Sequence, residues 1–168
     1  MKILVKSVVA AGCALVFSLG AASAEMKSAV TADELTSILG EAGLPVALIE
    51  DVDTKTPVAR VQAGAVQYWI RALDCAGSPK ACSTLVFFAN FDLGRDATQK
   101  DFEIINHYNE SQVFGRAYVI PGRNQVGVDY VIELEGGVSS DNITGNISRW
   151  ARVIDAFIAS FRQGHDIS

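Results

Sequence analysis

Few residues of this 168-residue chain stand in a spacing that supports catalysis. The two histidines, His107 and His165, lie far apart in the sequence, and neither lies near a serine or cysteine motif. No Gly-x-Ser-x-Gly nucleophile elbow is present, and Gly136-Gly137 lacks the third glycine and the lysine of a phosphate-binding loop. We therefore expect no enzyme, and we assign no catalytic residue, no cofactor and no metal.

The carboxylates of the second half do not form an acid–base pair either. Asp129 and Glu133 share one face of an expected strand, with Glu135 just beyond it. At about 3.3 Å per residue they stand about 13 Å apart, too far for paired general acid and base action. We interpret them as a solvated face.

Two cysteines, Cys75 and Cys82, flank a turn that contains Gly77-Ser78-Pro79. In an oxidising compartment such a pair is typical of a disulfide that closes a hairpin, which would add about 2 to 3 kcal/mol of stability. A redox pair is the alternative, but redox motifs usually hold two residues between the cysteines. A metal site would need two further ligands, and the histidines are distant.

Candidate binding residues lie on the two strands joined by this turn. The strand over 83–91 is apolar on both faces, with Val86 and Phe88 opposite the expected core residues, so a helix and a loop or a second copy must cover both sides. Trp69 falls on the polar face of the preceding strand, beside Arg71, and is either a binding anchor or half-buried under a loop.

Arg116 lies in a polar stretch that also contains Asn106 and Asn109. Arg116 either grips a carboxylate of a partner or pairs on the protein's own surface. In the second case the asparagines cap the helix end and satisfy the turn into Phe114. The candidate binding residues are therefore Trp69, Arg71, Phe88 and Arg116.

The N-terminus has the pattern of a secretory signal peptide. Lys2 and Lys6 precede an apolar stretch of about a dozen residues, and small residues occupy the positions before Glu25 that a signal peptidase reads. A retained anchor or a lipidated Cys13 is the less favoured alternative. We expect cleavage after Ala24, one domain over 25–168, and a periplasmic or secreted location.

Removal of Lys2 and Lys6 leaves 12 basic and 19 acidic side chains, so the net charge of the mature chain is −7. Such a surface repels phosphate backbones. We therefore expect no nucleic-acid partner, and no membrane span after cleavage.

Hydrophobic periodicity predicts an α+β fold, in which helices flank an antiparallel sheet in the order α-β-β-β-β-α-β-β-α. Expected helix starts are Thr31, Thr98 and Ser139 or Ser140. Phe102 and Ile105 should mark the inner face of the second helix, and an apolar stripe runs along the third. The expected helices are 32–42, 99–109 and 140–162, and the expected strands are 45–50, 57–63, 65–73, 83–91, 114–120 and 125–134.

Three segments carry a family resemblance: the first helix with Gly43-Leu-Pro-Val46, Asn106-His-Tyr-Asn109 before Phe114-Gly-Arg-Ala-Tyr118, and Leu134-Glu-Gly-Gly-Val138. Together they resemble the YbjN family, often labelled sensory transduction regulators, over about residues 31–161. The resemblance implies a fold similar to type III secretion chaperones, with a sheet often used for dimerisation. It implies no settled activity and no catalytic residues.

The leading hypothesis is a secreted, non-enzymatic binding or adaptor domain, chaperone-like or regulatory, that engages a protein partner. A second copy of the chain is one candidate for that partner. The alternative is a domain that binds a small apolar ligand between its sheet and helices.

Overall fold

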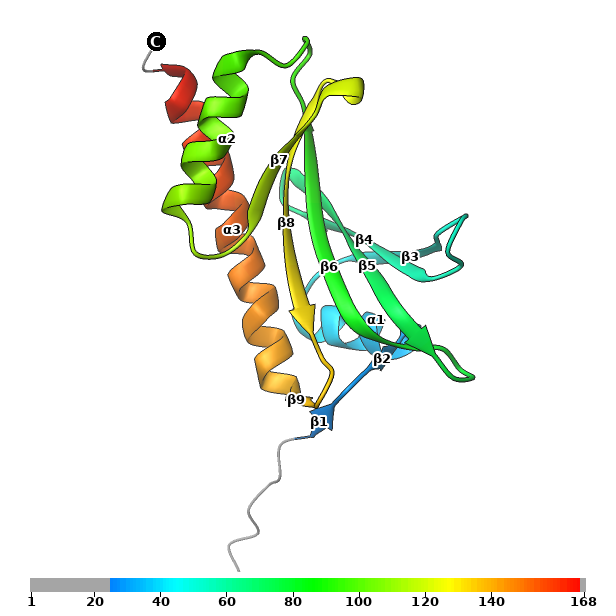
Figure 1. The fold of residues 1–168 in the computed structure, drawn as a ribbon. Helices are drawn as coiled ribbons and strands as arrows, with labels where there is room; N and C mark the ends of the chain where they lie inside the picture. Colours follow the sequence, from blue (N-terminus) through cyan, green and yellow to red (C-terminus); the bar gives the residue numbers. More distant parts are fainter. Residues whose placement is uncertain (1–24, 167–168) are drawn as a thin grey trace, which may run out of the picture.

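The computed structural model describes residues 25–166, and the predicted signal peptide, residues 1–24, lies outside the described residues. The observed elements confirm the α+β class and the predicted order (Figure 1). In addition to the predicted elements there are three two-residue strands and one 3-10 turn, η1. The elements are β1 (Met26–Lys27), β2 (Val30–Thr31), α1 (Ala32–Glu41), β3 (Val46–Glu50), β4 (Pro57–Ala63), β5 (Val66–Ala76), β6 (Ala81–Asp92), α2 (Gln99–Ser111), β7 (Arg116–Ile120), η1 (Pro121–Arg123), β8 (Gln125–Glu133), β9 (Val138–Ser139) and α3 (Ser140–Asp166).

The main sheet is antiparallel, with strand order β3-β4-β5-β6-β8-β7, and β2 pairs with one end of β6. β6 pairs with both β5 and β8 along most of its length. Leu85, Phe87 and Ala89 on one face of β6 are buried in the core, whereas Val86 and Phe88 on the other face are only half-buried. No helix within residues 25–166 covers that second face, so its cover by a second copy stays a prediction. β3 and β7 form the two edges.

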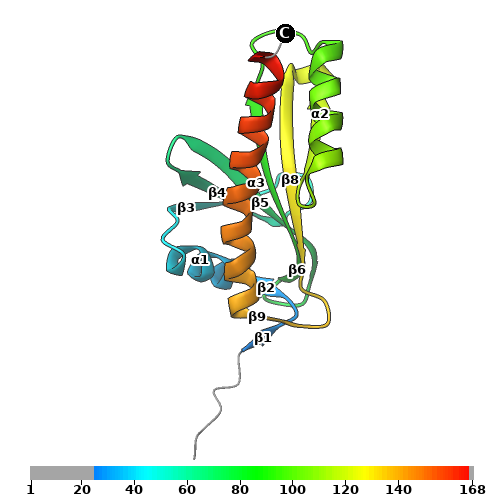
Figure 2. The ribbon, with the colours of Figure 1, turned by 90° about the vertical axis from the view of Figure 1, so that its left-hand side faces the viewer.

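All three helices pack on one face of the sheet. Figure 2 shows α3 running along the sheet, with α2 on one side of it and α1 on the other. Trp150 of α3 is fully buried, and its ring lies 5.7 Å from Tyr68 and 5.9 Å from Phe87, centroid to centroid. The predicted stripe on α3 is therefore core, as expected from its helical spacing.

The helix starts agree with the predicted caps. Thr31 and Glu34 form a capping box at α1, and Thr98 begins α2. Ser139 accepts a hydrogen bond from the backbone of Asn142 at the start of α3. None of the helices within residues 25–166 is long and apolar enough to cross a membrane.

The predicted inner face of α2 is wrong at one position, since Phe102 is 45 % exposed whereas Asp101 is fully buried. The Asp101 carboxylate accepts two hydrogen bonds from Arg95, of 2.7 and 2.9 Å. Because successive helix residues are about 100° apart, turning Asp101 inward turns Phe102 outward. The last helix also runs beyond the expected 140–162: α3 continues to Asp166 and includes His165, whose Nε2 lies 3.0 Å from Asp101 Oδ1.

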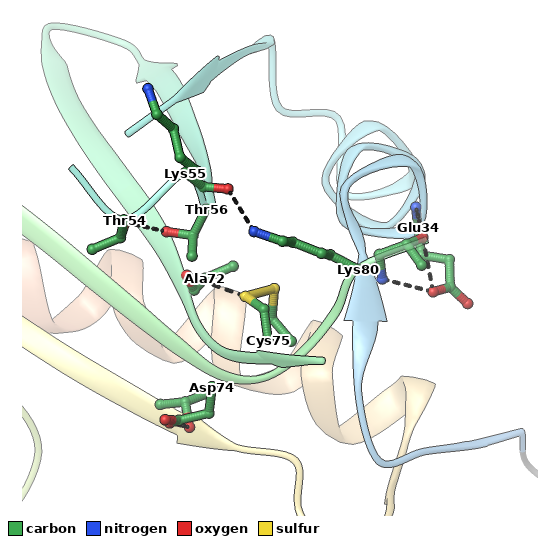
Figure 3. Close-up of a disulfide and its surroundings, with 11 residues drawn as sticks. Glu34, Thr54, Lys55, Thr56, Ala72, Asp74, Cys75 and Lys80 are labelled. Atoms are coloured by element: carbon green, nitrogen blue, oxygen red, sulfur yellow. Dashed lines mark hydrogen bonds between the residues drawn. A yellow bond between two sulfur atoms is a disulfide. The ribbon is translucent and has the colours of Figure 1, made fainter. Parts of the chain in front are cut away.

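The predicted disulfide joins Cys75 and Cys82 at the turn between β5 and β6 (Figure 3). Beside it, the Lys80 ammonium donates a 3.3 Å hydrogen bond to the Lys55 carbonyl, in the turn between β3 and β4. This bond connects the closed hairpin tip to the neighbouring hairpin.

Candidate functional site

The side of the sheet away from the three helices is here called the open face. Strand register places five side chains in one row across it, because directly paired residues point to the same side of a sheet. The row is Arg60 on β4, Trp69 on β5, Phe88 on β6, Asp129 on β8 and Arg116 on β7. Neighbouring members are about 5 Å apart, so the row spans about 19 Å.

An aromatic pair lies at the middle of this row. The rings of Trp69 and Phe88 stack, with centroids 5.7 Å apart and planes 18° from parallel, and both side chains are half-buried. The guanidinium carbon of Arg71 lies 5.4 Å from the centre of the Phe88 ring. Phe88 therefore contacts both Trp69 and Arg71, which brings three of the four residues singled out from the sequence together. They form a flat apolar surface with a cation on it.

Arg116, the fourth candidate, lies on the same face, two strands from Phe88. Its guanidinium makes two hydrogen bonds to the Asp129 carboxylate. The Arg116 side chain is 76 % exposed, whereas that of Asp129 is 12 % exposed. Of the two interpretations drawn from the sequence, the structure supports pairing on the protein's own surface.

Asn109 does not cap the end of α2, contrary to expectation. Its side-chain amide donates to the Ala117 carbonyl at 3.0 Å and its amide oxygen accepts from the Ala117 N–H at 2.8 Å. The side chain thus satisfies the outward backbone groups of β7 as a neighbouring strand would. α2 lies against β7, which brings Asn109 within reach of this edge.

Tyr118 and Asn90 add a polar border that sequence reasoning missed. The Tyr118 hydroxyl donates a 2.9 Å hydrogen bond to the Asn90 side chain, across β8. Between them lies Gly127, where an added Cβ would come within 2.6 Å of the Tyr118 ring. A glycine inside a strand pattern indicates such close approach and was the available signal. Burial raises the pKa of Tyr118 to about 12, so its hydroxyl is neutral at pH 7.

A hollow of about 460 Å³ runs from the aromatic pair to the β3–β4 turn and η1. Asp51 in that turn lies 3.8 Å from Arg71. Hydrogen bonds from the backbone and hydroxyl of Thr54 and the backbone of Asp53 hold the pKa of Asp51 below its ordinary value. The other lining side chains include Ile49, Val52, Val58, Asn90, Arg123 and Gln125.

Several arginines lie around the aromatic pair, although the net charge of the whole chain is −5. Arg60 and Arg71 flank the aromatic pair, and Arg123 lines the hollow. Among the described residues, Arg60 and Arg123 form no ion pair, whereas Arg71 and Arg116 have Asp51 and Asp129. The two unmatched guanidiniums provide local positive charge beside apolar rings.

The structure gathers no catalytic constellation around the residues considered for one. His107 is 76 % exposed on α2, and its nearest charged neighbour is Glu110 at 4.0 Å. The Thr84 hydroxyl lies 3.0 Å from the Glu133 carboxylate and 2.7 Å from that of Asp74, so Glu133 is not paired with Asp129. Within residues 25–166 no three His, Cys, Asp or Glu side chains come together as a metal site. Stacking, apolar contact and ion pairs are the interactions that the side chains of the open face offer.

Comparison with known proteins gives one match. The model of a family described as "Putative bacterial sensory transduction regulator" matches residues 31–163. No curated protein and no solved structure matches the chain, so the similarity to type III secretion chaperones stays a prediction. The family description is that of a regulator and names no enzymatic activity. Because the match covers most of the chain, from α1 into α3, the protein belongs to the YbjN family.

Proposed function

We propose that this protein is a secreted, non-enzymatic adaptor domain that holds a segment of a partner protein on its open face. The observation that carries the proposal is the stacked Trp69–Phe88 pair, left half-buried and flanked by arginines. Aromatic and arginine side chains are the residue types most enriched at the energetic centres of protein interfaces.

The chemistry of the face specifies the partner segment. Val131 is 51 % exposed and belongs to the row next to Phe88, so apolar contact extends beyond the aromatic pair. Arg60 and Arg123 favour carboxylates in the partner. The segment should therefore place an aromatic or aliphatic side chain on the Trp69 ring and an Asp or Glu on either side. An acidic, apolar polypeptide fits this description, whereas a basic one does not.

One observation supports a location outside the cytoplasm: the Cys75–Cys82 bond suits an oxidising compartment.

The test is site-specific photo-crosslinking in cells that secrete the protein. A photoreactive side chain replaces Val131 on the open face or, as the control, Val113, which is 89 % exposed in the loop between α2 and β7. We expect a discrete adduct at Val131 that is lost on Trp69→Ala and weakened by Arg60→Glu. Equal labelling at the two positions, or an adduct at Val131 that persists in Trp69→Ala, would contradict the proposal.

A small apolar ligand is the second candidate, and a separate crevice favours it. The crevice lies between the end of α1, the β4–β5 turn and α3, with a volume of about 270 Å³, and is lined largely by apolar groups including Leu44, Val66, Ile147 and Ile154. Native mass spectrometry of the gently purified protein separates the candidates. Extra mass of a few hundred daltons supports the ligand, and a bound polypeptide supports the adaptor.

A further inference from the structure

One edge strand of the main sheet, β7, is covered, whereas the other, β3, is exposed. At the β7 edge, the Asn109 side chain forms hydrogen bonds with the outward N–H and C=O of Ala117, and α2 lies alongside the strand. At the other edge, the four residues Ala47 to Glu50 of β3 are all exposed. An uncovered edge is a template for another strand, and proteins that remain monomeric guard such edges.

The direction of the backbone groups on β3 follows from its pairing with β4. Asp51 N–H donates to the Thr56 carbonyl, and Gln62 N–H donates to the Pro45 carbonyl. In an antiparallel pair the residues that bond to the partner alternate with residues that point away. Residues 45, 47, 49 and 51 therefore bond toward β4, and Val46, Leu48 and Glu50 present their N–H and C=O groups outward.

Most of the common guards are missing from β3, whose one charged side chain is Glu50 at the end of the strand. Its sequence, Val-Ala-Leu-Ile-Glu, contains no lysine and no proline, and its register with β4 runs from 46 to 50 without a bulge. The side chains of Leu48 and Ile49 are 39 % and 51 % exposed on opposite sides of the strand. Both sides of this edge are thus apolar as well as unpaired.

We propose that the β3 edge binds the β3 edge of a second copy, so that two sheets continue as one across a two-fold axis at Leu48. In this antiparallel register Leu48 forms a hydrogen-bonded pair with its own copy, and Val46 pairs with Glu50 of the other chain. The outward backbone N–H and C=O groups of Val46, Leu48 and Glu50 in each chain are then all hydrogen-bonded to the other chain.

Self-pairing fits the side chains as well as the backbone. On the open face, Ala47 of each chain lies opposite Ile49 of the other, an apolar pair in the closer, non-hydrogen-bonded arrangement. On the helix side, the two Leu48 side chains meet at the axis. The two Glu50 carboxylates stand four residues apart along the strands, about 13 Å, so no like charges lie opposite each other. The same patch is therefore complementary to itself, as a two-fold interface requires.

This pairing is independent of the proposed partner site, because it uses the edge of the sheet and leaves the Trp69–Phe88 pair uncovered. Sedimentation equilibrium of the chain from Glu25 onward should give a dimer at micromolar concentration. Leu48→Pro removes one outward N–H and no bond to β4, and it should raise the dimer dissociation constant at least tenfold. Val131→Lys, on the open face, is the control and should leave the dissociation constant unchanged.

Cysteine crosslinking tests the register. Hydrogen-bonded antiparallel pairs have Cα atoms about 5.5 Å apart, within the range of a disulfide, so Leu48→Cys should form a covalent dimer on mild oxidation. Val46→Cys, two residues away on the same side of β3, should not, because its copy would be about 13 Å away. A monomer at 100 µM overturns the proposal, as does a dimer that Val131→Lys disrupts and Leu48→Pro does not, or equal crosslinking at both cysteines.

Discussion

Replacing Asn109 by alanine should destabilise the protein by about 2 to 3 kcal/mol. The change removes two hydrogen bonds, of 2.8 and 3.0 Å, to Ala117, a residue that is 4 % exposed. A neutral hydrogen bond contributes about 1 kcal/mol net, and a buried backbone group left without its partner costs more. The matched control is Asn106→Ala, an identical change on the same helix. Both asparagines are exposed, but for Asn106 no side-chain hydrogen bond is seen in the described structure.

The assay is urea unfolding of both variants, followed by circular dichroism. Asn106→Ala should lie within about 0.5 kcal/mol of the parent, as surface changes usually do. Asn109→Ala should lower the melting temperature by about 5 to 10 °C, given about 2 to 4 °C per kcal/mol for a domain of this size. It should also aggregate at a lower concentration, because the β7 edge becomes available to other strands. A difference of less than about 0.5 kcal/mol between the unfolding free energies of the two variants would refute the conclusion that the Asn109 side chain covers the β7 edge.

Three further changes give distinct expectations. Replacing Cys75 and Cys82 together by serine should cost about 2 to 3 kcal/mol in urea unfolding, and a reducing agent should then have no further effect on the variant. Asp101→Asn should be less stable than the parent at pH 7, because hydrogen bonds from Arg95 hold the pKa of Asp101 well below its ordinary value. A lowered pKa contributes stability above the unfolded-state pKa of about 3.9, so the gap between the two unfolding free energies should narrow as the pH falls below about 4. Gly127→Ala should cost at least about 1 kcal/mol and separate Tyr118 from Asn90, which Tyr118 ring resonances would report by NMR.

Local signals were sufficient for the order of the elements. The Thr31–Glu34 capping box and the Ser139 cap depend on residues three apart, and the apolar spacing of α3 is set by one face of one helix. The cysteine pair needed only a short turn and an oxidising compartment. Such features can be predicted because the groups involved are close in sequence.

The positions that sequence reasoning missed or assigned wrongly all depend on partners outside their own helix or strand. Phe102 turns outward because Asp101 is committed to Arg95 and to His165 at the far end of the chain. Asn109 lies against β7 because α2 packs beside that strand. The position of Asn109 within the helix does not predict which strand the helix packs against. Position 127 requires glycine because a Cβ there would collide with Tyr118 and Asn90, which belong to two other strands.

By itself, the sequence determined the fold class, the disulfide and the set of aromatic and arginine residues available for binding. Only the tertiary structure decided that Trp69, Arg71 and Phe88 meet, that Arg116 is engaged by Asp129, and which sheet edge is left open. The physical reason is strand register. Periodicity fixes which side of its own strand a residue occupies, whereas pairing between strands fixes which residues become neighbours across the sheet.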